Sequence, residues 1–409
     1  MTSKARVWII NQYASTPEVG MGGRHYYLAR SLASQGFDVT LVSASFGHKM
    51  RKPPLVTNRF TTSEQDGFDI VWVRVFKYLG SGSPVRILNW FLFAFYLRFL
   101  PAFLSEKPDA VYYSSPSLIG YLGAERLAKK FGAKLFFEIR DIWPLTLQKL
   151  GGYTKNNPLI RFMYWVERRA YKNADVLISN LQGAGKHIAN MAGQSDNFVW
   201  VPNGVLVGEV SSPDPLPSSF QDEIKKWKFV VGYTGAIGKV NAINVLVEAA
   251  DLIKESHPDI GFVAIGEGEQ KKHLMSRVAD ANMSNFTFLA PVAKSQVQSA
   301  LSLFDALYLG WLDDDLYDFG IGANKIPEYL YSQRPVIHSY SGGCDPIEAS
   351  GAGVTIPAED ARKLAKAIVD LYEMTPEERL SLGEKGRAYA LENYDFDKLS
   401  LKISELIRS

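Results

Sequence analysis

Residues 318–337, DFGIGANKIPEYLYSQRPVI, place a lysine and a carboxylate three positions apart. This spacing puts both on one helical face, and we expect the helix to begin near Ala323 with Asn324 and Lys325 in its first turn. A lysine beside a helix N-terminus can neutralise a diphosphate, and Glu328, one turn later, can accept hydrogen bonds from a ribose diol. The alternative interpretation is an ordinary surface ion pair between Lys325 and Glu328.

Two glycine loops in the same half of the chain follow runs that are typical of buried strands. The candidate ligand-binding residues in them are Gly235 and Lys239 in the first loop, and Gly266 and Glu267 in the second. Ligands of open α/β sheets bind outside the carboxyl ends of the strands. We therefore expect both loops to open on the same edge as Lys325 and to bind a phosphorylated ligand.

A third glycine loop follows the first apolar run, residues 7–10. Gly22 and Gly23 precede a segment of helical periodicity, so backbone N–H groups there could approach a phosphate. Nine residues separate Ile10 from Gly20, whereas the dinucleotide fingerprint has its glycines directly after the strand. A nicotinamide enzyme is therefore disfavoured, while a phosphate site and a surface loop with turn glycines both remain open.

The segment FEIRDIWP, residues 137–144, places Arg140 and Asp141 after another apolar run. We expect both at the strand edge of the first half, as catalytic candidates, although such a pair can also be purely structural. His25, His48 and His187 are scattered without metal-ligand spacing, so no metal site is expected.

Short apolar runs alternate with helical patterns throughout, which indicates an α/β fold with parallel sheets covered by helices on both faces. The expected strands lie at 7–10, 38–43, 70–75, 110–113, 135–137, 176–178 and 199–201, and then at 229–233, 262–265, 286–289, 306–309, 335–337 and 354–356. The proline-rich stretch 211–219, SSPDPLPSS, is typical of a connector. Residues from Thr375 onward predict helices with a break near 394–397.

Composition narrows the function classes. The 409 residues carry 45 Lys and Arg against 43 Asp and Glu, so no global basic field points to nucleic acid. The single cysteine, Cys344, excludes an intramolecular disulfide and any multi-cysteine zinc site. The N-terminal residues lack the apolar run of a signal peptide, and we expect a cytoplasmic protein.

Five segments together resemble the retaining GT-B glycosyltransferases of family 4, over nearly the whole chain. They are GGRHYYLARSLASQGFDVTLVSA at 22–44, FEIRDIWP at 137–144, VWVPNGV at 199–205, GYTGAIGKVNAINVLVEAADLI at 232–253 and ANKIPEYLYSQRPVI at 323–337. The second and last are similar to a branch of O-antigen and capsule synthesis that transfers N-acetylated amino sugars to lipid-linked saccharides.

The resemblance implies two Rossmann-like domains facing a cleft: an acceptor domain at 1–205, a nucleotide-sugar domain at 206–385, and a C-terminal helix at 386–409 that crosses back to the first domain. It implies an NDP-sugar donor, expected to be UDP-linked, with no metal or other cofactor, and a polyprenyl-diphosphate-linked acceptor. The implied roles are diphosphate stabilisation for Lys325, ribose binding for Glu328, further donor contacts for Asn324, Gly235, Lys239, Gly266, Glu267, Gly22 and Gly23, catalysis beside Arg140 and Asp141, and acceptor binding for Arg24 and His25.

Three positions depart from the family pattern. Gly320 replaces the first of two paired glutamates, Ala236 replaces a common arginine, and Arg140 stands where a histidine is often found. In this class the leaving phosphate is thought to accept the acceptor proton, so no side-chain base is required. A UDP-sugar 2-epimerase on the same scaffold and a non-catalytic two-domain sugar-binding protein remain alternatives.

The aromatic run at 86–104, RILNWFLFAFYLRFLPAFL, is apolar enough to suggest a membrane helix. Strands of one sheet are expected on both sides of it, and a single span would separate them across the bilayer. The run is therefore either a buried crossover helix or an interfacial helix that makes peripheral membrane contact.

Overall fold

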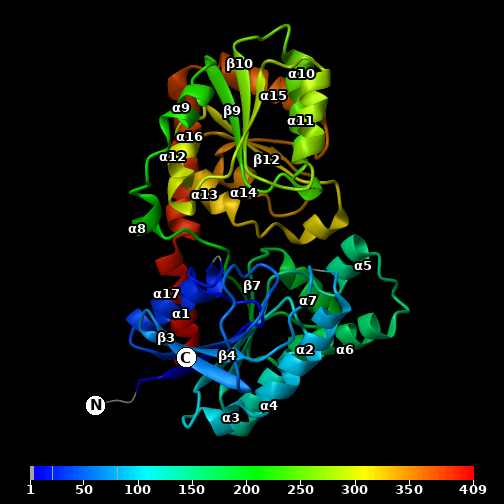
Figure 1. The fold of residues 1–409 in the computed structure, drawn as a ribbon, viewed down its shortest axis with the longest axis vertical. Coiled ribbons are helices and arrows are strands. Elements are labelled where there is room, and N and C mark those ends of the chain that lie inside the picture. Colours follow the sequence, from blue (N-terminus) through cyan, green and yellow to red (C-terminus); the bar gives the residue numbers. More distant parts are fainter. Residues whose placement is uncertain (1–3, 21, 81) are drawn as a thin grey trace. The chain divides into compact units, whose positions relative to one another are not determined.

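The computed structural model describes residues 4–20, 22–80 and 82–409 and divides into two compact units. The first unit is Met1–Pro202 with Asp397–Ser409, and the second is Asn203–Phe396. Each unit holds one sheet with helices on both of its faces (Figure 1). This confirms the α/β fold class expected from the alternating sequence pattern.

The sheet of the first unit has eight strands in the order β3-β4-β2-β1-β5-β6-β7-β8. The strands are β1 (Arg6–Ile10), β2 (Asp38–Ala44), β3 (Phe60–Gln65), β4 (Phe68–Val73), β5 (Ala110–Ser114), β6 (Lys134–Ile139), β7 (Val176–Ser179) and β8 (Phe198–Trp200). The helices are α1 (Arg24–Ser34), α2 (Pro84–Leu97), α3 (Leu100–Phe103), α4 (Tyr121–Phe131), α5 (Leu145–Gly151), α6 (Pro158–Asn173) and α7 (Ala184–Ala192).

One strand of this sheet, β3, was not predicted from the sequence. β3 pairs antiparallel with β4 at the sheet edge, whereas all other pairs in this sheet are parallel. Of its residues, FTTSEQ, only Phe60 is buried. An edge strand exposed to water needs no apolar run, so the pattern that marks the central strands is missing here.

The sheet of the second unit has six parallel strands in the order β11-β10-β9-β12-β13-β14. They are β9 (Phe229–Thr234), β10 (Ile260–Ile265), β11 (Phe286–Leu289), β12 (Ala306–Gly310), β13 (Val336–Ser339) and β14 (Gly353–Ile356). The helices are α8 (Val207–Val210), α9 (Ser218–Ile224), α10 (Ile243–Ile253), α11 (Lys271–Asp280), α12 (Val297–Leu301), α13 (Lys325–Tyr331), α14 (Pro346–Ser350), α15 (Ala361–Glu373) and α16 (Pro376–Asn393), with 3₁₀ turns η1 (Lys239–Asn241), η2 (Lys294–Gln296) and η3 (Asp315–Phe319).

The C-terminal helix α17 (Phe396–Arg408) packs with the first unit, although α16 belongs to the second. The hydroxyl of Ser400 lies 2.6 Å from the hydroxyl of Ser31, and Lys134 Nζ donates to the Leu406 carbonyl at 2.8 Å. The chain therefore leaves the first unit after Pro202 and returns to it at α17.

Helix α2, which contains most of the aromatic run, has two apolar faces. Asn89, Trp90, Phe93 and Leu97 are buried, whereas Leu88, Phe91 and Phe95 are exposed. Among the described residues, no helix is long and apolar enough to cross a membrane. α2 is thus packed in the crossover between β4 and β5 and also presents an apolar stripe to its surroundings.

Substitutions on the two faces of α2 are expected to lower the free energy of unfolding by different amounts. Phe93 is fully buried, so Phe93→Ala is expected to lower the free energy of unfolding by about 3–5 kcal/mol. Phe91 is 43% exposed and stacks on Phe162, so Phe91→Ala is expected to lower the free energy of unfolding by only about 0.5–1.5 kcal/mol. Urea unfolding followed by circular dichroism measures both values, and equal losses would contradict this description of α2.

Candidate functional site

Two glycine loops meet at the carboxyl ends of β9 and β10 in the second unit. The Gly235 amide donates to the Ile265 carbonyl at 2.9 Å, and the Ile237 amide donates to the Glu267 carbonyl at 2.8 Å. A Cβ on Gly266 would lie 1.8 Å from the Gly235 carbonyl oxygen, a distance that no side chain permits. The glycines therefore allow the two loops to pack backbone against backbone.

Lys325 reaches this loop pair from the start of α13. Its Nζ donates to the hydroxyl of Tyr233 at 2.8 Å and to Oδ1 of Asn241 at 2.7 Å. The ammonium also lies 4.5 Å from the ring centre of Tyr233 and 5.5 Å from that of Trp311. A Cβ on Gly235 would lie 3.3 Å from Nζ, so the lysine sits directly against the first glycine loop.

The charge of Lys325 has no acidic partner. Within the described residues no carboxylate lies within ion-pair distance of Nζ, and its hydrogen-bond partners are a neutral phenol and a neutral amide. Burial lowers the pKa of Lys325 to about 7. An anion placed here would supply the missing counter-charge and favour the ammonium form.

A buried chain of side chains holds Trp311 beneath Lys325. The Trp311 indole N–H donates to Nε2 of His338 at 3.0 Å, and Nδ1 of His338 lies 2.8 Å from Asp345 Oδ1. Because Nε2 accepts from the indole, the proton of His338 is on Nδ1 and is donated to Asp345. Asp345 also accepts from Thr355 and from the Ile347 amide, which ties the chain to α14 and β14.

The other side chains predicted to bind the donor differ in their exposure to solvent and in their partners. Glu328 is largely buried, and its carboxylate forms an ion pair with the exposed Lys294. Asn324 is the exposed N-cap of α13, and its side chain makes no capping hydrogen bond. Lys239 is exposed on η1, and Glu267 pairs with Lys271 at 2.6 Å. Lys325, Gly235 and Gly266 are thus brought together, while these four side chains lie around them.

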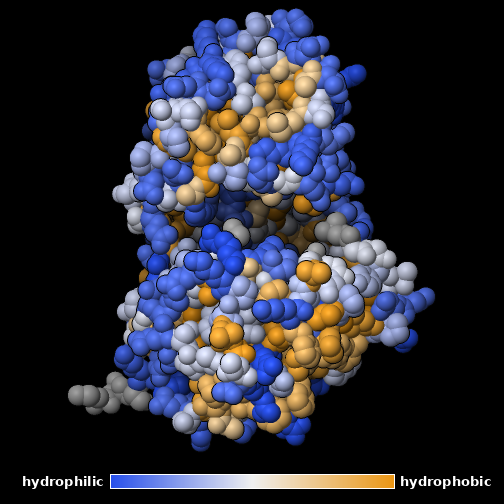
Figure 2. Space-filling view, in the orientation of Figure 1, coloured by the Kyte–Doolittle hydropathy of each residue, from blue (hydrophilic) through white to orange (hydrophobic). Residues whose placement is uncertain are grey.

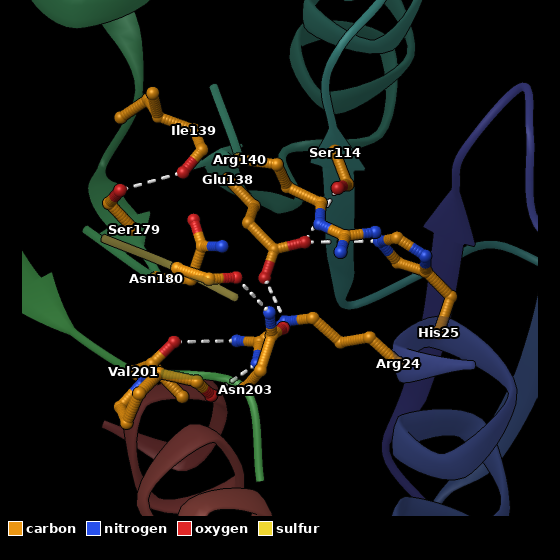
Figure 3. Close-up of polar contacts among 12 residues, drawn as sticks. Arg24, His25, Ser114, Glu138, Ile139, Arg140, Ser179, Asn180, Val201 and Asn203 are labelled. Carbon is orange, nitrogen blue, oxygen red and sulfur yellow. Dashed lines mark hydrogen bonds and ion pairs between the residues drawn. The ribbon is translucent and has the colours of Figure 1, made fainter. Parts of the chain in front are cut away.

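In the first unit, Glu138 at the end of β6 is the centre of a buried polar cluster (Figure 3). Oε1 of Glu138 accepts from Arg24 Nε at 2.5 Å. Oε2 lies 3.0 Å from His25 Nε2 and accepts from the Ser114 hydroxyl at 2.5 Å. Arg24 further donates to the carbonyls of Val201 and Pro202, at the point where the chain leaves this unit.

The charges in this cluster explain its pKa shifts. Burial acts to raise the pKa of Glu138, but Arg24 and His25 outweigh it and hold that pKa well below its ordinary value. Burial lowers the pKa of His25 despite its contact with Glu138. Glu138 is therefore a carboxylate paired with the Arg24 guanidinium, and the predicted acceptor residues Arg24 and His25 are both engaged inside the unit.

Arg140 and Asp141 follow Glu138 directly. The Arg140 amide donates to the Ser115 hydroxyl at 2.9 Å, and burial together with Arg24 lowers the pKa of Arg140 although Glu138 raises it. Its Nε is buried without a hydrogen-bond partner in the part of the chain that the structure describes. Asp141 is exposed. The structure thus gathers Arg24, His25 and Arg140 around one carboxylate.

The glycine loop of the first unit leads into α1. Gly22 and Gly23 have φ angles of 65° and 111°, which favour glycine over other residues. Gly23 is the N-cap of α1, no side chain caps that end, and the first turn contains no acidic residue. The first turn of α1 therefore offers no carboxylate of its own to the amide groups at the start of the helix.

Several residues of both clusters were not predicted as site residues. Tyr233, Asn241, Trp311 and His338 lie in four separate segments, and only folding brings them to Lys325. Glu138 stood next to a predicted pair, but its apolar strand context gave no sign of a buried charge. In the described ranges no three His, Cys, Asp or Glu residues are grouped so as to hold a metal ion.

The chain thus has two Rossmann-like units, and glycine loops and a partly buried lysine lie at the strand edge of the second unit. The family described as "Glycosyl transferase 4-like domain" matches residues 19–204, and the family described as "Glycosyl transferases group 1" matches residues 228–374. The chain belongs to the family 4 glycosyltransferases with the GT-B fold and is a glycosyltransferase. This decides against the sugar-binding protein and the epimerase considered from the sequence.

Known relatives agree with this assignment. The chain is 23% identical over 304 residues to WcaI of Escherichia coli K12, named as a glycosyl transferase of colanic acid biosynthesis, which covers 71% of this chain and 73% of WcaI. Its fold is similar to sucrose-phosphate synthase from Thermosynechococcus elongatus, with a TM-score of 0.72, 16% identity and coverage of 99% and 98%. It is also similar to Anabaena HepE in complex with UDP and glucose, with a TM-score of 0.67, 13% identity and 99% coverage of both chains.

The lowered pKa of Lys325 predicts a pH-dependent cost to stability. Between about pH 7 and the unfolded pKa near 10.4, the unfolded chain binds more protons at this lysine than the folded chain, so raising the pH stabilises the fold. Lys325→Met is expected to unfold at a higher temperature than the wild type at pH 6. Deprotonation of Lys325 adds at most roughly 1.4 kcal/mol per pH unit to the free energy of unfolding of the wild type. The difference in unfolding temperature between Lys325→Met and the wild type should therefore narrow from pH 7 to 9.

Thermal melts at pH 6, 7, 8 and 9 measure this gap. Lys366→Met removes an exposed lysine and serves as the control, with no pH-dependent gap expected. A constant gap for Lys325→Met would show that Lys325 is not deprotonated in this range.

The Glu138 cluster predicts a large loss from a nearly isosteric change. Glu138→Gln leaves the Arg24 guanidinium, 4% exposed, without a counter-charge and should cost about 3–5 kcal/mol of unfolding free energy. Glu125 is also buried, but its partners Arg169 and Lys129 are 36% and 64% exposed, so Glu125→Gln should cost less. Chemical unfolding of both variants provides the comparison, and equal costs would contradict the proposed difference in solvent screening.

Proposed function

We propose that this glycosyltransferase transfers an N-acetylated amino sugar from a UDP-sugar to a lipid-linked saccharide, with retention of the anomeric configuration. The reaction would serve surface polysaccharide synthesis at the inner face of the cytoplasmic membrane. The observation that supports a diphosphate donor most directly is the ammonium of Lys325, which is held against the Gly235 loop and pairs with no carboxylate in the part of the chain that the structure describes.

The proposed chemistry uses this cation when the glycosidic bond breaks. The bond between the anomeric carbon and the phosphate oxygen carries its electron pair to the diphosphate, where negative charge develops. The preorganised Lys325 ammonium stabilises that charge more strongly than water would, because its hydrogen bonds already hold it in place and it is partly shielded from solvent. The departing phosphate oxygen accepts the proton of the acceptor hydroxyl, whose oxygen bonds to the anomeric carbon on the same face.

The remaining donor contacts follow from the positions of the loops. Glu328 would accept hydrogen bonds from the ribose hydroxyls while it keeps the pairing with Lys294. The Gly235 and Gly266 loops would lie against the phosphates, although the Gly235 and Gly266 amides are themselves hydrogen-bonded within the protein. Lys239 and Asn324 are exposed and free to reach the ligand from the rim. Trp311 would act from below, because its ring and its hydrogen bond to His338 set the position of the ammonium.

Two relatives support the donor and the pathway. HepE was solved with UDP and glucose, and the name of WcaI assigns it to colanic acid biosynthesis. A UDP-sugar donor and a saccharide acceptor on a lipid carrier fit both. In the first unit, Arg140, Asp141, Gly22 and Gly23 remain our candidates for contacts with the reacting sugars, and Arg24 and His25 for the acceptor.

Titration of UDP-sugars into Lys325→Met tests the donor assignment. The variant keeps the length of the side chain but removes its charge, so we expect at least about a hundredfold weaker binding of UDP and of the preferred UDP-sugar, and loss of most transfer. Lys366→Met, which removes an exposed lysine from α15, should bind and react like the wild type.

A panel of UDP- and GDP-linked sugars, followed by calorimetry and by mass spectrometry of the product, provides the readouts. Unchanged UDP affinity in Lys325→Met would contradict the assignment of the diphosphate site. Formation of an epimer from the UDP-sugar alone would contradict glycosyl transfer, and inversion at the anomeric carbon, seen by NMR, would contradict retention.

A further inference from the structure

The outer surface of α2 and α6 carries aromatic and aliphatic side chains that the fold does not cover. We call Leu88, Phe91, Phe95, Phe162 and Trp165 the α2–α6 face. Leu88, Phe95 and Trp165 are 53%, 54% and 52% exposed. Figure 2 shows hydrophobic residues gathered where these two helices lie in Figure 1. Isolated exposed apolar residues are ordinary, but a contiguous group of this kind marks an interaction surface.

Ring contacts show that this face is continuous across the two helices. Phe91 of α2 stacks on Phe162 of α6 with ring centres 6.2 Å apart and an angle of 19° between the rings. Phe162 in turn stacks on Trp165 at 5.8 Å. The three rings therefore form one row, and Leu88 and Phe95 extend it along α2 because they lie three and four residues from Phe91.

The charge pattern around this face is one-sided. The segments 39–63, 70–105 and 142–166 contain 11 Lys and Arg residues and no Asp or Glu, although the whole chain carries nearly equal numbers of both. Arg98 and Arg161 are exposed at the face itself, and neither forms an ion pair within the described residues. The side chains of the apolar row thus come from segments whose charged residues are all basic.

Exposed aliphatic and aromatic residues also occur on the loops that precede α2. Leu55 and Leu79 are 89% and 95% exposed, and Phe76 is 55% exposed. They belong to the same acid-free segments. The combination of protruding apolar side chains and exposed cations is what an anionic lipid surface recognises: the rings enter the headgroup region while the cations contact lipid phosphates.

We propose that the α2–α6 face docks the first unit onto a bilayer that contains anionic lipid, with Leu88, Phe91, Phe95 and Trp165 inserted among the headgroups and Arg98 and Arg161 at the lipid phosphates. This goes beyond the proposed function, because it assigns a lipid-binding surface that holds whatever sugar is transferred. A protein partner would be expected to offer carboxylates to this basic surface. A second copy of the chain would bring like charges together, which disfavours self-association.

Co-sedimentation of the full chain with vesicles, in the absence of nucleotide, tests this surface. The wild type should bind vesicles of equal parts phosphatidylcholine and phosphatidylglycerol at least about tenfold more strongly than vesicles of phosphatidylcholine alone, and salt should weaken that preference. The variant with Leu88→Ser, Phe91→Ser and Phe95→Ser should lose at least about tenfold in binding to the anionic vesicles.

A matched control removes exposed apolar residues from the second unit. Leu252→Ser, Met275→Ser and Leu380→Ser change side chains that are 54%, 47% and 50% exposed, and this triple variant should bind vesicles like the wild type. Circular dichroism and UDP binding should be unchanged in both triple variants. Vesicle binding reports on this surface, and UDP binding reports on the proposed function. Failure of the one can therefore be told apart from failure of the other.

Two results would overturn the proposal. One is equal vesicle binding by the wild type and the α2–α6 variant. The other is a wild-type dimer in solution that the α2–α6 variant converts to a monomer without any change in vesicle binding, because a second copy would then be the occupant. Brominated phosphatidylcholine adds a local readout: it should quench the fluorescence of the wild type more than that of Trp165→Phe.

Discussion

A partly buried cation that forms no ion pair with a carboxylate of the described residues is the constraint on which the second unit depends. Lys325 could be stabilised cheaply by a nearby carboxylate, yet its hydrogen bonds go to Tyr233 and Asn241, and its ring contacts are with Tyr233 and Trp311. Burial lowers the pKa of Lys325, so keeping the side chain as an ammonium there costs stability. The close packing of the Gly235 and Gly266 loops and the chain from Trp311 to Asp345 both serve to hold that cation where an anionic ligand would supply the missing charge.

The first unit also contains a buried cation, but this one is paired with a carboxylate. Its buried arginine, Arg24, is fully compensated by Glu138, and the same guanidinium binds the last carbonyls before the chain leaves the unit. This cluster connects α1, β5, β6 and the end of β8 through one carboxylate. The charge of Arg24 is thus compensated within the unit by Glu138, whereas Lys325 forms no ion pair among the described residues.

Sequence patterns predicted much of this fold because parallel strands covered on both faces must be apolar throughout, and all thirteen expected strands are present. The edge strand β3 was missed because half of its surface faces water, so FTTSEQ has no apolar run. Lys325 and Glu328 were found because their spacing within one helix is local. Tyr233, Asn241, Trp311 and Glu138 were not, since their roles arise from contacts between segments up to 114 residues apart, which no local spacing encodes. The pattern for α2 left a buried and an interfacial helix open, and the structure shows one helix with a core face and an exposed apolar face.

Proton uptake on UDP binding tests the central claim most directly. At pH 8 Lys325, with a pKa of about 7, is mostly neutral in the free protein, and a bound diphosphate favours its ammonium form. Calorimetry in buffers of different ionisation enthalpy should therefore show that UDP binding takes up a proton at pH 8 and that Lys325→Met abolishes the uptake. Tight UDP binding with the same proton balance in the wild type and in Lys325→Met would contradict the account.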